Sequence, residues 1–385
     1  MRVILVNKFY YPRGGDCIYT MALERLLKSR DDNVAIFSME YGKNYNSEWS
    51  RYWPREMRWH DIFSRPFGSD EVISKFKELC NDFKPDVVHL NNIHTQISPV
   101  VARIAKSYGA KVIWTLHDTK PVCPAYSCMR KGKWCESCFT NKRSVVRYRC
   151  MRGGLLGSII GYRELLKWNP AVLQECVDTF IAPSKFMADT CIRGGYSADK
   201  FYTLHNFMDP DKLRVPNVNR GNYYLYFGRL SRVKGVETLC KAAVELPYNL
   251  VIAGGGDLEE TLRMRYGSYS TIRFTGECEW RKLRTLIEGA RFVVVPSEWS
   301  ENNPLSIIES LSLGTPVLGA NIGGVPELIT SECGMTFHSG SVEELGCSIV
   351  RMFESNFDYK SIALNAAQKF SAERYYDELM KLYKK

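Results

Sequence analysis

The sequence lacks the features that mark membrane-spanning, fibrous or disordered proteins. Its longest unbroken apolar stretches, such as Phe292–Val295, are far shorter than the roughly 20 residues that a membrane-spanning helix needs. It contains no low-complexity tract and no repeat of solenoid period. Its first residues form a short apolar run without the small-residue cleavage site of a signal peptide. We therefore expect a cytoplasmic globular protein that begins with a strand.

Composition and charge narrow the class further. At 385 residues the chain exceeds the size of most single cores, which favours two domains. Lys and Arg number 52 against 42 Asp and Glu, a formal net charge of +10. This excess favours anionic partners, such as phosphorylated ligands or acidic lipid headgroups. Nucleic acid is not expected, because no recognition motif accompanies the charge.

Short apolar strands alternate with helical stretches in two series, which predicts an α/β fold with two Rossmann-like domains facing each other across a cleft. The segment 200–222, rich in Pro, Asn and Gly, is the best linker candidate. We assign 1–204 to an N-terminal Rossmann-like domain, 205–370 to a C-terminal Rossmann-like domain, and 371–385 to a helix that crosses back to the first domain. The strands are expected at 2–7, 34–38, 86–90, 111–116 and 178–182, and then at 223–227, 249–253, 271–275, 292–296 and 316–320.

The segment 296–309 carries the sharpest chemical signal. Asn303 is expected to cap a helix that starts with Pro304, so that backbone N–H groups from Asn302 to Leu305 point toward an anion. Glu301 and Glu309 stand on either side, and carboxylates accept hydrogen bonds from sugar and ribose hydroxyls. The alternative is a surface helix with ordinary acidic residues.

A second signal is the basic loop 228–235, which follows a predicted strand. Arg229 and Lys234 can converge there on a diphosphate, although basic loops are often only solvated. Gly14 and Gly15 follow the first strand and allow close approach of a ligand to the backbone. No Asp-x-Asp motif lies where a metal bound to such a diphosphate would be needed, so ligand binding without a catalytic divalent ion is expected.

Together these pieces resemble the family 4 retaining glycosyltransferases of the GT-B fold, over nearly the whole chain. The resemblance rests on the Gly14-Gly15 loop, on Thr115 to Asp118, and on the pair Glu301 and Glu309 with seven residues between them. It extends to Gly228-Arg229-Leu230 with Lys234-Gly235, and to 314–317 and 323–327. One departure is that Asn302-Asn303 replaces the Gly-Phe often found after the first Glu.

The resemblance implies a retaining, metal-independent hexosyltransferase that moves a sugar from a UDP- or GDP-sugar. The acceptor would be a saccharide, lipid-linked by preference, in polysaccharide, O-antigen or capsule synthesis. On this reading Arg229 and Lys234 neutralise the diphosphate, Glu301 holds sugar hydroxyls and Glu309 holds the ribose. His117 would hydrogen-bond the donor; whether it also transfers a proton is open. The alternatives are a sugar-nucleotide epimerase of the same fold and a catalytically silent sugar-nucleotide-binding protein.

An insert at about 119–152 contains a cluster of cysteines. The spacing of Cys123, Cys135, Cys138 and Cys150 suits a structural zinc ion, with free thiols, disulfides or an iron–sulfur cluster as alternatives. Similar inserts occur in family members that build bacterial surface polysaccharides. The insert is also basic and precedes an amphipathic stretch, which favours peripheral contact with the anionic inner face of the cell membrane. An ordinary basic insert packed on a helix is the alternative.

Overall fold

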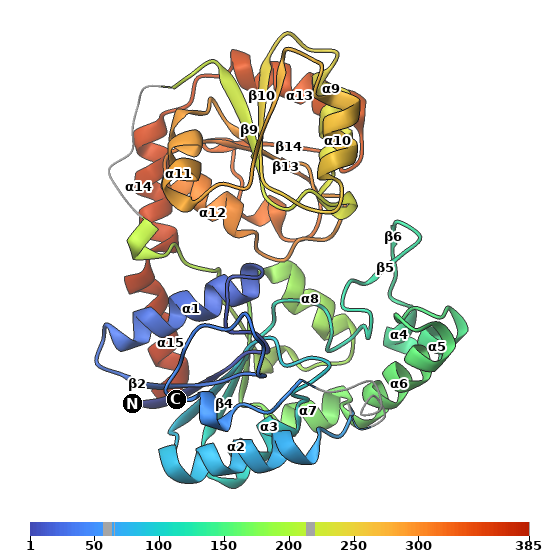
Figure 1. Ribbon diagram of the computed structural model, residues 1–385, viewed down its shortest axis with the longest axis vertical. Coiled ribbons are helices and arrows are strands. Elements are labelled where there is room, and N and C mark those ends of the chain that lie inside the picture. The colour runs from blue at the N-terminus through green and yellow to red at the C-terminus, as the bar shows by residue number, and fades with distance from the viewer. Residues whose placement is uncertain (57–63, 65, 213–219, 385) are drawn as a thin grey trace. The chain divides into compact units, whose positions relative to one another are not determined.

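A computed structural model describes residues 1–56, 64, 66–212 and 220–384 of the chain (Figure 1). It divides into two compact units. Unit 1 comprises Met1–Leu204 and Tyr376–Lys385, and unit 2 comprises His205–Tyr375.

Unit 1 is built on a parallel six-stranded sheet in the order β2-β1-β3-β4-β7-β8. Its strands alternate with helices, as expected for a parallel sheet that is covered on its faces. The strands are β1 (Arg2–Val6), β2 (Asn33–Phe37), β3 (Val87–Leu90), β4 (Lys111–Thr115), β7 (Thr179–Ala182) and β8 (Phe201–Thr203). The helices are α1 (Gly15–Lys28), α2 (Asp70–Phe83), α3 (Val100–Ser107), α7 (Pro170–Cys176) and α8 (Lys185–Arg193), with a 3₁₀ turn at Ser50–Tyr52 and another at Ala198–Lys200.

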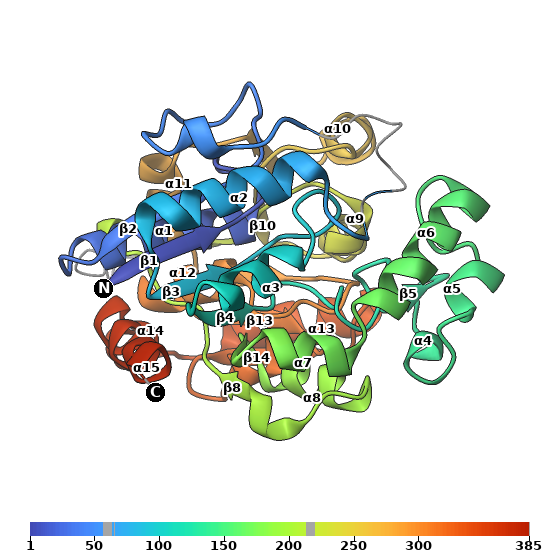
Figure 2. The ribbon, with the colours of Figure 1, turned by 90° about the horizontal axis from the view of Figure 1, so that it is seen from below.

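The insert between β4 and β7 adds smaller elements to unit 1. They are the hairpin β5 (Met129–Arg130) and β6 (Lys133–Trp134), and the helices α4 (Ser137–Thr140), α5 (Ser144–Arg147) and α6 (Gly154–Lys167). Lys131 and Gly132 both have positive φ at the hairpin turn, the conformation that matches the twist of a two-residue hairpin. Figures 1 and 2 both show these elements grouped together beside the sheet.

Unit 2 has a second parallel six-stranded sheet, in the order β11-β10-β9-β12-β13-β14. This is the 3-2-1-4-5-6 order of a Rossmann fold. The strands are β9 (Tyr223–Phe227), β10 (Asn249–Ala253), β11 (Ile272–Gly276), β12 (Val293–Val295), β13 (Val317–Ala320) and β14 (Gly334–Phe337). The helices are α9 (Val236–Ala243), α10 (Glu259–Tyr266), α11 (Trp280–Gly289), α12 (Leu305–Ser312), α13 (Val342–Glu354) and α14 (Tyr359–Phe370), with 3₁₀ turns at Pro210–Lys212, Arg232–Lys234 and Val325–Glu327.

The last helix, α15 (Ala372–Lys384), starts in unit 2 and belongs to unit 1 from Tyr376 onward. Within unit 1 the Tyr383 hydroxyl lies 2.6 Å from Nδ1 of His89, a buried residue of β3. The Tyr376 hydroxyl donates to Asp32 over 3.0 Å. These bonds attach the end of the chain to the first sheet. Among the described residues, no helix is both long and apolar enough to cross a bilayer.

The expected fold class, α/β with two Rossmann-like domains, is confirmed, and the expected strands form within one or two residues of their predicted ends. Four strands were missed: the short β5 and β6 of the insert hairpin, and one strand of each six-stranded sheet, β8 and β14. β14 has two of its four residues partly or fully exposed, and β8 has only three residues, none fully buried, so neither carries a strong apolar pattern. The segment 200–222, expected to be an irregular linker, therefore begins with an edge strand. Its residues 213–219 lie outside the described residues.

Candidate active site

The predicted donor-binding residues of unit 2 follow two neighbouring strands. β9 and β12 are adjacent in the sheet, at the point where the strand order reverses. Arg229 and Lys234 follow β9, and Glu301 follows β12. Parallel open sheets bind ligands at the carboxyl ends of such strands. The topology thus brings these side chains to the usual place for a ligand.

Glycine makes the close packing of these loops possible. Gly235 has φ of +67°, and a Cβ there would lie 1.9 Å from the carbonyl oxygen of Pro296. Gly323 has φ of +62°, and a Cβ there would lie 2.2 Å from the carbonyl oxygen of Glu301. Any side chain at either position would push the loops apart. The glycines therefore set where Lys234 and Glu301 stand.

Lys234 and Glu301 form an ion pair, with Nζ 2.5 Å from Oε1. The same carboxylate oxygen accepts a hydrogen bond from the Ser297 hydroxyl over 2.8 Å. The Glu301 side chain is 11% exposed and that of Lys234 is 34% exposed. A carboxylate has two oxygens that can each accept more than one hydrogen bond, so Glu301 keeps acceptor capacity for a ligand.

Arg229 lies in the same loop after β9 as Lys234. Its guanidinium is exposed and forms no ion pair within the described part of the chain. Its backbone carbonyl accepts a hydrogen bond from the Tyr226 hydroxyl over 2.8 Å. Burial raises the pKa of Tyr226, the charge of Glu301 raises it further, and Arg229 opposes both. The Tyr226 hydroxyl thus holds the backbone of Arg229 at the carboxyl end of β9.

The predicted helix cap at Asn303 is wrong. α12 begins at Leu305, with Pro304 in the N-cap position and no side-chain cap. The Asn303 side chain instead accepts from the backbone N–H of Asn206 (2.8 Å) and contacts Nδ1 of His205 (3.0 Å). Its hydrogen-bonding capacity is used by a different segment, so it is not available to the helix. Because Pro304 has no N–H, the first helical N–H groups are those of Leu305 and Ser306. Asn302 precedes them in the loop after β12.

Glu309 has a partner that the sequence analysis missed. Its Oε1 lies 2.5 Å from Nζ of Lys212, whose ammonium also stands 4.4 Å from the ring centre of Trp280. Burial raises the pKa of Glu309, while Lys212 opposes the rise and Asp209 adds to it. Lys212 is 97 residues away in the sequence, in the segment expected to be a linker, and no local pattern singles it out.

The predicted residues of unit 1 likewise follow adjacent strands. Gly14 precedes α1 in extended conformation, and Gly15 is the first residue of that helix, after the loop that leaves β1. Asn92, which follows β3, donates to the carboxylate of Asp16 over 2.9 Å. β1 and β3 are neighbours at the reversal of strand order in this sheet. Gly14 and Gly15 therefore lie at the expected ligand-binding edge of unit 1.

His117 follows β4 and faces the same group of residues. Its Nε2 lies 3.0 Å from Oδ1 of Asn91, and its ring meets that of Tyr19 edge-on at 5.0 Å. Burial lowers the pKa of His117, against the opposing charges of Asp16 and Asp118. The imidazole is therefore neutral near pH 7, with one nitrogen that donates and one that accepts.

His94 and Asp118 form a further pair in unit 1, with Nε2 3.2 Å from Oδ1. Burial acts to raise the pKa of Asp118, but its interactions with His94 and with the backbone N–H and the charge of Lys120 together outweigh burial and lower it. His94 also lines a small cavity with Lys120 and Glu164, whose own ion pair measures 2.8 Å. Glu164 belongs to α6, so this cavity connects the His117 region with the insert.

The cysteines of the insert influence one another. Burial and the charges of Cys123, Cys150 and Cys135 raise the pKa of Cys138 to about 12. Cys123 lies beside Cys128, whose thiol and backbone N–H, with other nearby N–H groups, lower the pKa of Cys123 to about 6. However, no group of three or more His, Cys, Asp or Glu residues within the described ranges is placed to hold a metal ion. The zinc site stays a prediction.

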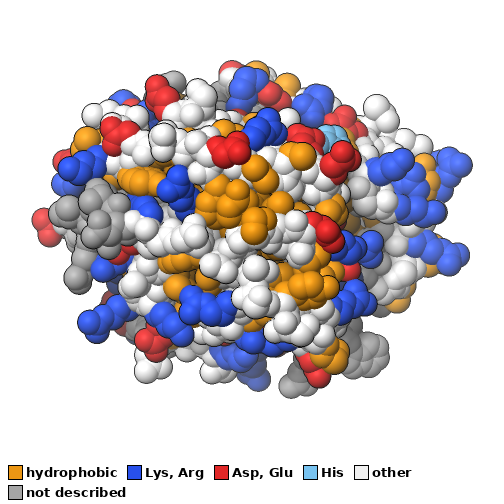
Figure 3. Space-filling view, turned by 90° about the horizontal axis from the view of Figure 1, so that it is seen from above, with side chains coloured by type: hydrophobic (Ala, Val, Ile, Leu, Met, Phe, Trp, Pro, Cys, Tyr) orange, Lys and Arg blue, Asp and Glu red, His pale blue; other side chains and the backbone are white. Residues whose placement is uncertain are grey.

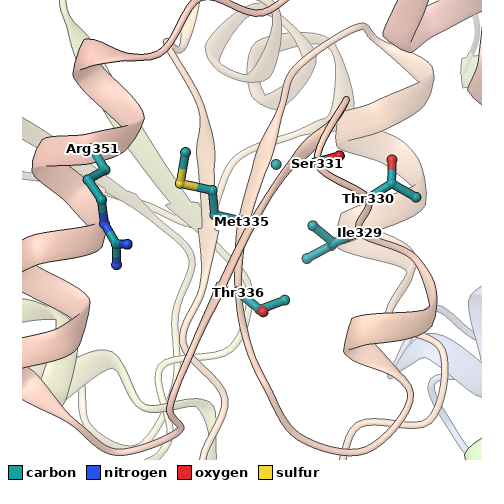
Figure 4. A pocket seen from close by; sticks show the side chains of 7 residues that line it. Ile329, Thr330, Ser331, Met335, Thr336 and Arg351 are labelled. Atoms are coloured by element: carbon teal, nitrogen blue, oxygen red, sulfur yellow. The ribbon is translucent and has the colours of Figure 1, made fainter.

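An open pocket of about 330 Å³ lies elsewhere in unit 2 (Figure 4). It is lined by Ile329, Thr330, Ser331, Gly334, Met335, Thr336 and Arg351. Gly334 starts β14, so the pocket lies at the amino end of that strand, whereas the site residues follow carboxyl ends. The face seen in Figure 3 mixes apolar, basic and acidic side chains without segregating one kind. We assign this pocket no part in the site.

Comparison with known proteins agrees with the two-unit architecture. Residues 13–212 match the family described as Glycosyltransferase Family 4, and residues 210–380 match Glycosyl transferases group 1. The chain belongs to glycosyltransferase family 4. An uncharacterized 42.6 kDa protein in the cps region of Klebsiella pneumoniae is 24% identical over 85% of this glycosyltransferase and 87% of its own length. The O-antigen biosynthesis glycosyltransferase WbnH of Escherichia coli is 28% identical over 47% of this chain and 52% of its own.

Solved structures show the same fold for this family member. The lipopolysaccharide outer core galactosyltransferase WaaB, in its apo form, aligns with a TM-score of 0.67 and 16% identity over 99% of both chains. Anabaena Alr3699/HepE, in complex with UDP-glucose, aligns with a TM-score of 0.68 and 17% identity over 98% of both chains. At such identity these likenesses establish the GT-B fold.

Proposed function

We propose that this protein transfers a hexose, with retention of anomeric configuration, from a UDP- or GDP-sugar to a saccharide acceptor. Unit 2 binds the donor and unit 1 the acceptor. The acceptor is lipid-linked, and the product belongs to a bacterial surface polysaccharide such as O-antigen or capsule. The names of the Klebsiella pneumoniae and Escherichia coli relatives support the pathway, and the UDP-glucose complex of the Anabaena protein supports the donor class.

One observation carries the proposal: a cation after β9 is paired with a carboxylate after β12 at the reversal of strand order. When the bond between the sugar and the phosphate breaks, a further negative charge develops on the nucleoside diphosphate that leaves, and a positive charge aimed at its phosphates stabilises the transition state. Lys234 supplies a point charge, and Arg229, which pairs with no carboxylate among the described residues, supplies a planar fork. We assign neutralisation of the leaving group to these two side chains and not to a divalent ion.

The carboxylates then bind the two hydroxyl-bearing ends of the donor. Glu301 accepts from hydroxyls of the sugar, since its second oxygen is not engaged by Lys234 or Ser297. Glu309 accepts from the ribose, and Lys212, its ion-pair partner, opposes the rise in pKa that burial of the Glu309 carboxyl causes. The N–H groups of Leu305 and Ser306, at the start of α12, lie between these carboxylates along the chain and suit a phosphate oxygen. Asn303 fixes the loop through Asn206 and acts by positioning.

His117 contributes a neutral imidazole from unit 1. Because burial holds its pKa low, it can hydrogen-bond a sugar hydroxyl or phosphate oxygen without adding a charge. Gly14 and Gly15 leave the backbone at the β1 edge open to a ligand. Whether His117 moves a proton is decided by its replacement, described among the predictions below.

The donor class is tested by the shift in unfolding temperature with UDP-, GDP-, ADP- and dTDP-sugars. A ligand at 100 times its dissociation constant adds about 2.7 kcal/mol of stability. We expect one nucleotide class to give a shift that Lys234→Ala abolishes. Lys241→Ala is the matched control, since Lys241 is an exposed lysine of α9, 53% exposed, whose carboxylate partner is Glu237. Equal shifts in the two variants would refute the assigned site.

The reaction is tested with the donor so identified and saccharide acceptors. Nuclear magnetic resonance of the product reports the anomeric configuration, and turnover with and without a chelator reports any need for a divalent ion. An inverted product or full loss of turnover in chelator would contradict the proposal. Epimerisation of the donor without an acceptor would favour the epimerase, and binding without turnover would favour the silent binder.

A further inference from the structure

The insert of unit 1 concentrates the positive charge of the protein. Residues 129–168 contain ten Lys and Arg and two Glu, a net charge of +8 in a chain whose total is +10. Both carboxylates are already paired with cations outside this segment. Glu136 binds Arg193 at 2.9 Å, and Glu164 binds Lys120 at 2.8 Å. None of the ten basic residues forms an ion pair with any described residue. Their charge is therefore available to an external partner.

The same segment exposes apolar side chains on one helix. Leu155, Leu156, Ile159 and Leu166 of α6 are 40–50% exposed. They account for four of the twelve large apolar side chains exposed in the described ranges. Spacings of four and seven residues place Leu155, Ile159 and Leu166 on one face of the helix. Phe67, 41% exposed, lies beside the same helix, with its ring centre 4.1 Å from Nζ of Lys167.

The opposite face of α6 is fixed by close packing, so these side chains cannot turn inward. A Cβ at Gly157 would lie 2.1 Å from the carbonyl oxygen of Arg152. A Cβ at Gly161 would lie 3.1 Å from the side chain of Met151 and 3.2 Å from that of Pro124. Glycine thus lets the helix approach the underlying loop closely on this side only. The outward leucines are consequently a fixed feature of the surface.

Basic side chains border this apolar face in the sequence and in space. Arg147 ends α5, and Arg149 and Arg152 lie in the loop that leads into α6; all three are exposed. α5 packs against α6, and the guanidinium of Arg130 from the hairpin stands 4.1 Å from the ring centre of Tyr148. The hairpin, α5 and α6 therefore form one surface, grouped in Figures 1 and 2, which we name the insert face.

We propose that the insert face docks on an anionic lipid bilayer, with the leucines of α6 in the interface and the basic side chains at the headgroups. Apolar side chains beside basic residues that pair with no described carboxylate suit a surface that is both apolar and negatively charged. A second copy of the chain would bring two faces of charge +8 together and is disfavoured by repulsion. An acidic protein surface would complement the positive charge of the insert face, but it would not by itself account for the exposed leucines of α6. The proposal concerns binding alone and does not depend on the donor chemistry.

Sedimentation of the full chain with lipid vesicles, without donor or acceptor, tests the proposal. Vesicles of phosphatidylcholine alone are compared with vesicles that contain phosphatidylglycerol. We expect binding to the anionic vesicles that weakens as salt is raised, and little binding to the neutral ones. No binding to anionic vesicles, or equal binding to both kinds, would overturn the proposal. Because donor binding is measured separately, failure here leaves the transferase assignment standing.

Two sets of variants locate the binding surface. The first set removes exposed apolar side chains of α6 and consists of Leu155→Ser, Leu156→Ser and Ile159→Ser in one chain. Its control is Met264→Ser with Leu364→Ser, at apolar side chains that are 72% and 64% exposed in unit 2. The expected result is loss of vesicle binding in the first set alone, with donor-induced thermal shifts intact in both. Equal loss in the control set would refute the insert face. The proposal would also be refuted if the first set changed the oligomeric state and left vesicle binding unchanged, because a second copy of the chain would then be the partner of the insert face.

The charge set is Arg147→Glu with Arg149→Glu and Arg152→Glu. Each basic residue near an anionic surface contributes about fivefold to partitioning, so the triple change should weaken binding by roughly a hundredfold or more. Its control makes the same change of net charge at exposed lysines of other helices in unit 1. These are Lys28→Glu, Lys185→Glu and Lys381→Glu, with side chains 47%, 73% and 67% exposed. An equal effect of the control would mean that net charge alone governs binding and would overturn the proposal.

Discussion

Replacement of Lys234 by Met separates the structural and functional roles of its ion pair. The change leaves the Glu301 carboxylate, 11% exposed, with only the Ser297 hydroxyl bond. Breaking a fully buried pair costs about 3–5 kcal/mol, whereas an exposed pair contributes about 0–1 kcal/mol. Lys234 is 34% exposed, so we expect an intermediate loss of about 2 kcal/mol. For a domain the size of unit 2 this lowers the unfolding temperature by about 4–8 °C.

A second replacement, Glu301→Gln, distinguishes stability from binding. In the double variant Lys234→Met, Glu301→Gln no buried charge is left unpaired, so most of the lost stability should return. Donor affinity should not return. Loss of a charged hydrogen bond to the diphosphate costs about 2–3 kcal/mol, roughly a 30- to 150-fold rise in the dissociation constant.

Calorimetric titration with the donor and urea unfolding measure the two quantities on the same samples. Lys241→Met, on the exposed surface of α9, is the control for loss of one lysine. The reasoning fails if Lys234→Met binds the donor as the unmodified protein does. It also fails if the double variant is no more stable than the single one, because the pair would then not be the cause of the lost stability.

Three further predictions concern other residues of the two units. Burial raises the pKa of Glu309, so the stability that this carboxyl contributes is full below pH 4.5 and is lost as pH rises through its pKa in the folded state. When the free energy of unfolding in urea is measured against pH, this loss should be absent in Glu309→Gln and larger in Lys212→Met. Burial lowers the pKa of His117, so its imidazole should titrate with a midpoint below 6.5 in nuclear magnetic resonance spectra, and a midpoint at or above 6.5 would contradict this. His117→Gln should lower turnover more than donor affinity, with an altered pH profile only if the imidazole transfers a proton. If the insert binds zinc, elemental analysis should find one zinc ion per chain, and the double variant Cys135→Ser, Cys138→Ser should lose it. A zinc content that is the same in the double variant and in the unmodified protein would exclude the site.

Much of the fold and part of the candidate site could be read from local sequence. Runs such as 223–227 and 249–253 are buried strands because several apolar residues follow one another between polar turns, and they form at the predicted bounds. The residues after β9 and β12 were identified because charged side chains and glycines stand together at strand ends. The predicted helix cap at Asn303 was wrong because it depends on a distant part of the chain. A cap rule considers the helix alone, whereas the Asn303 side chain binds the backbone of Asn206, 97 residues away.

The sequence alone determined the two series of strands and helices, the excess of positive charge and the chemical types at the strand ends. Each depends on residues close together in the chain, where periodicity and turn chemistry act. The ion-pair and hydrogen-bond partners became known from the tertiary structure alone. They are Lys212 for Glu309, Glu301 for Lys234, and Tyr383 for His89, which is 294 residues away in the sequence. The tertiary structure also decided that the leucines of α6 face outward, because close packing at Gly157 and Gly161 fixes which side of the helix is covered. Such pairings follow from how the chain returns on itself, which no local pattern encodes.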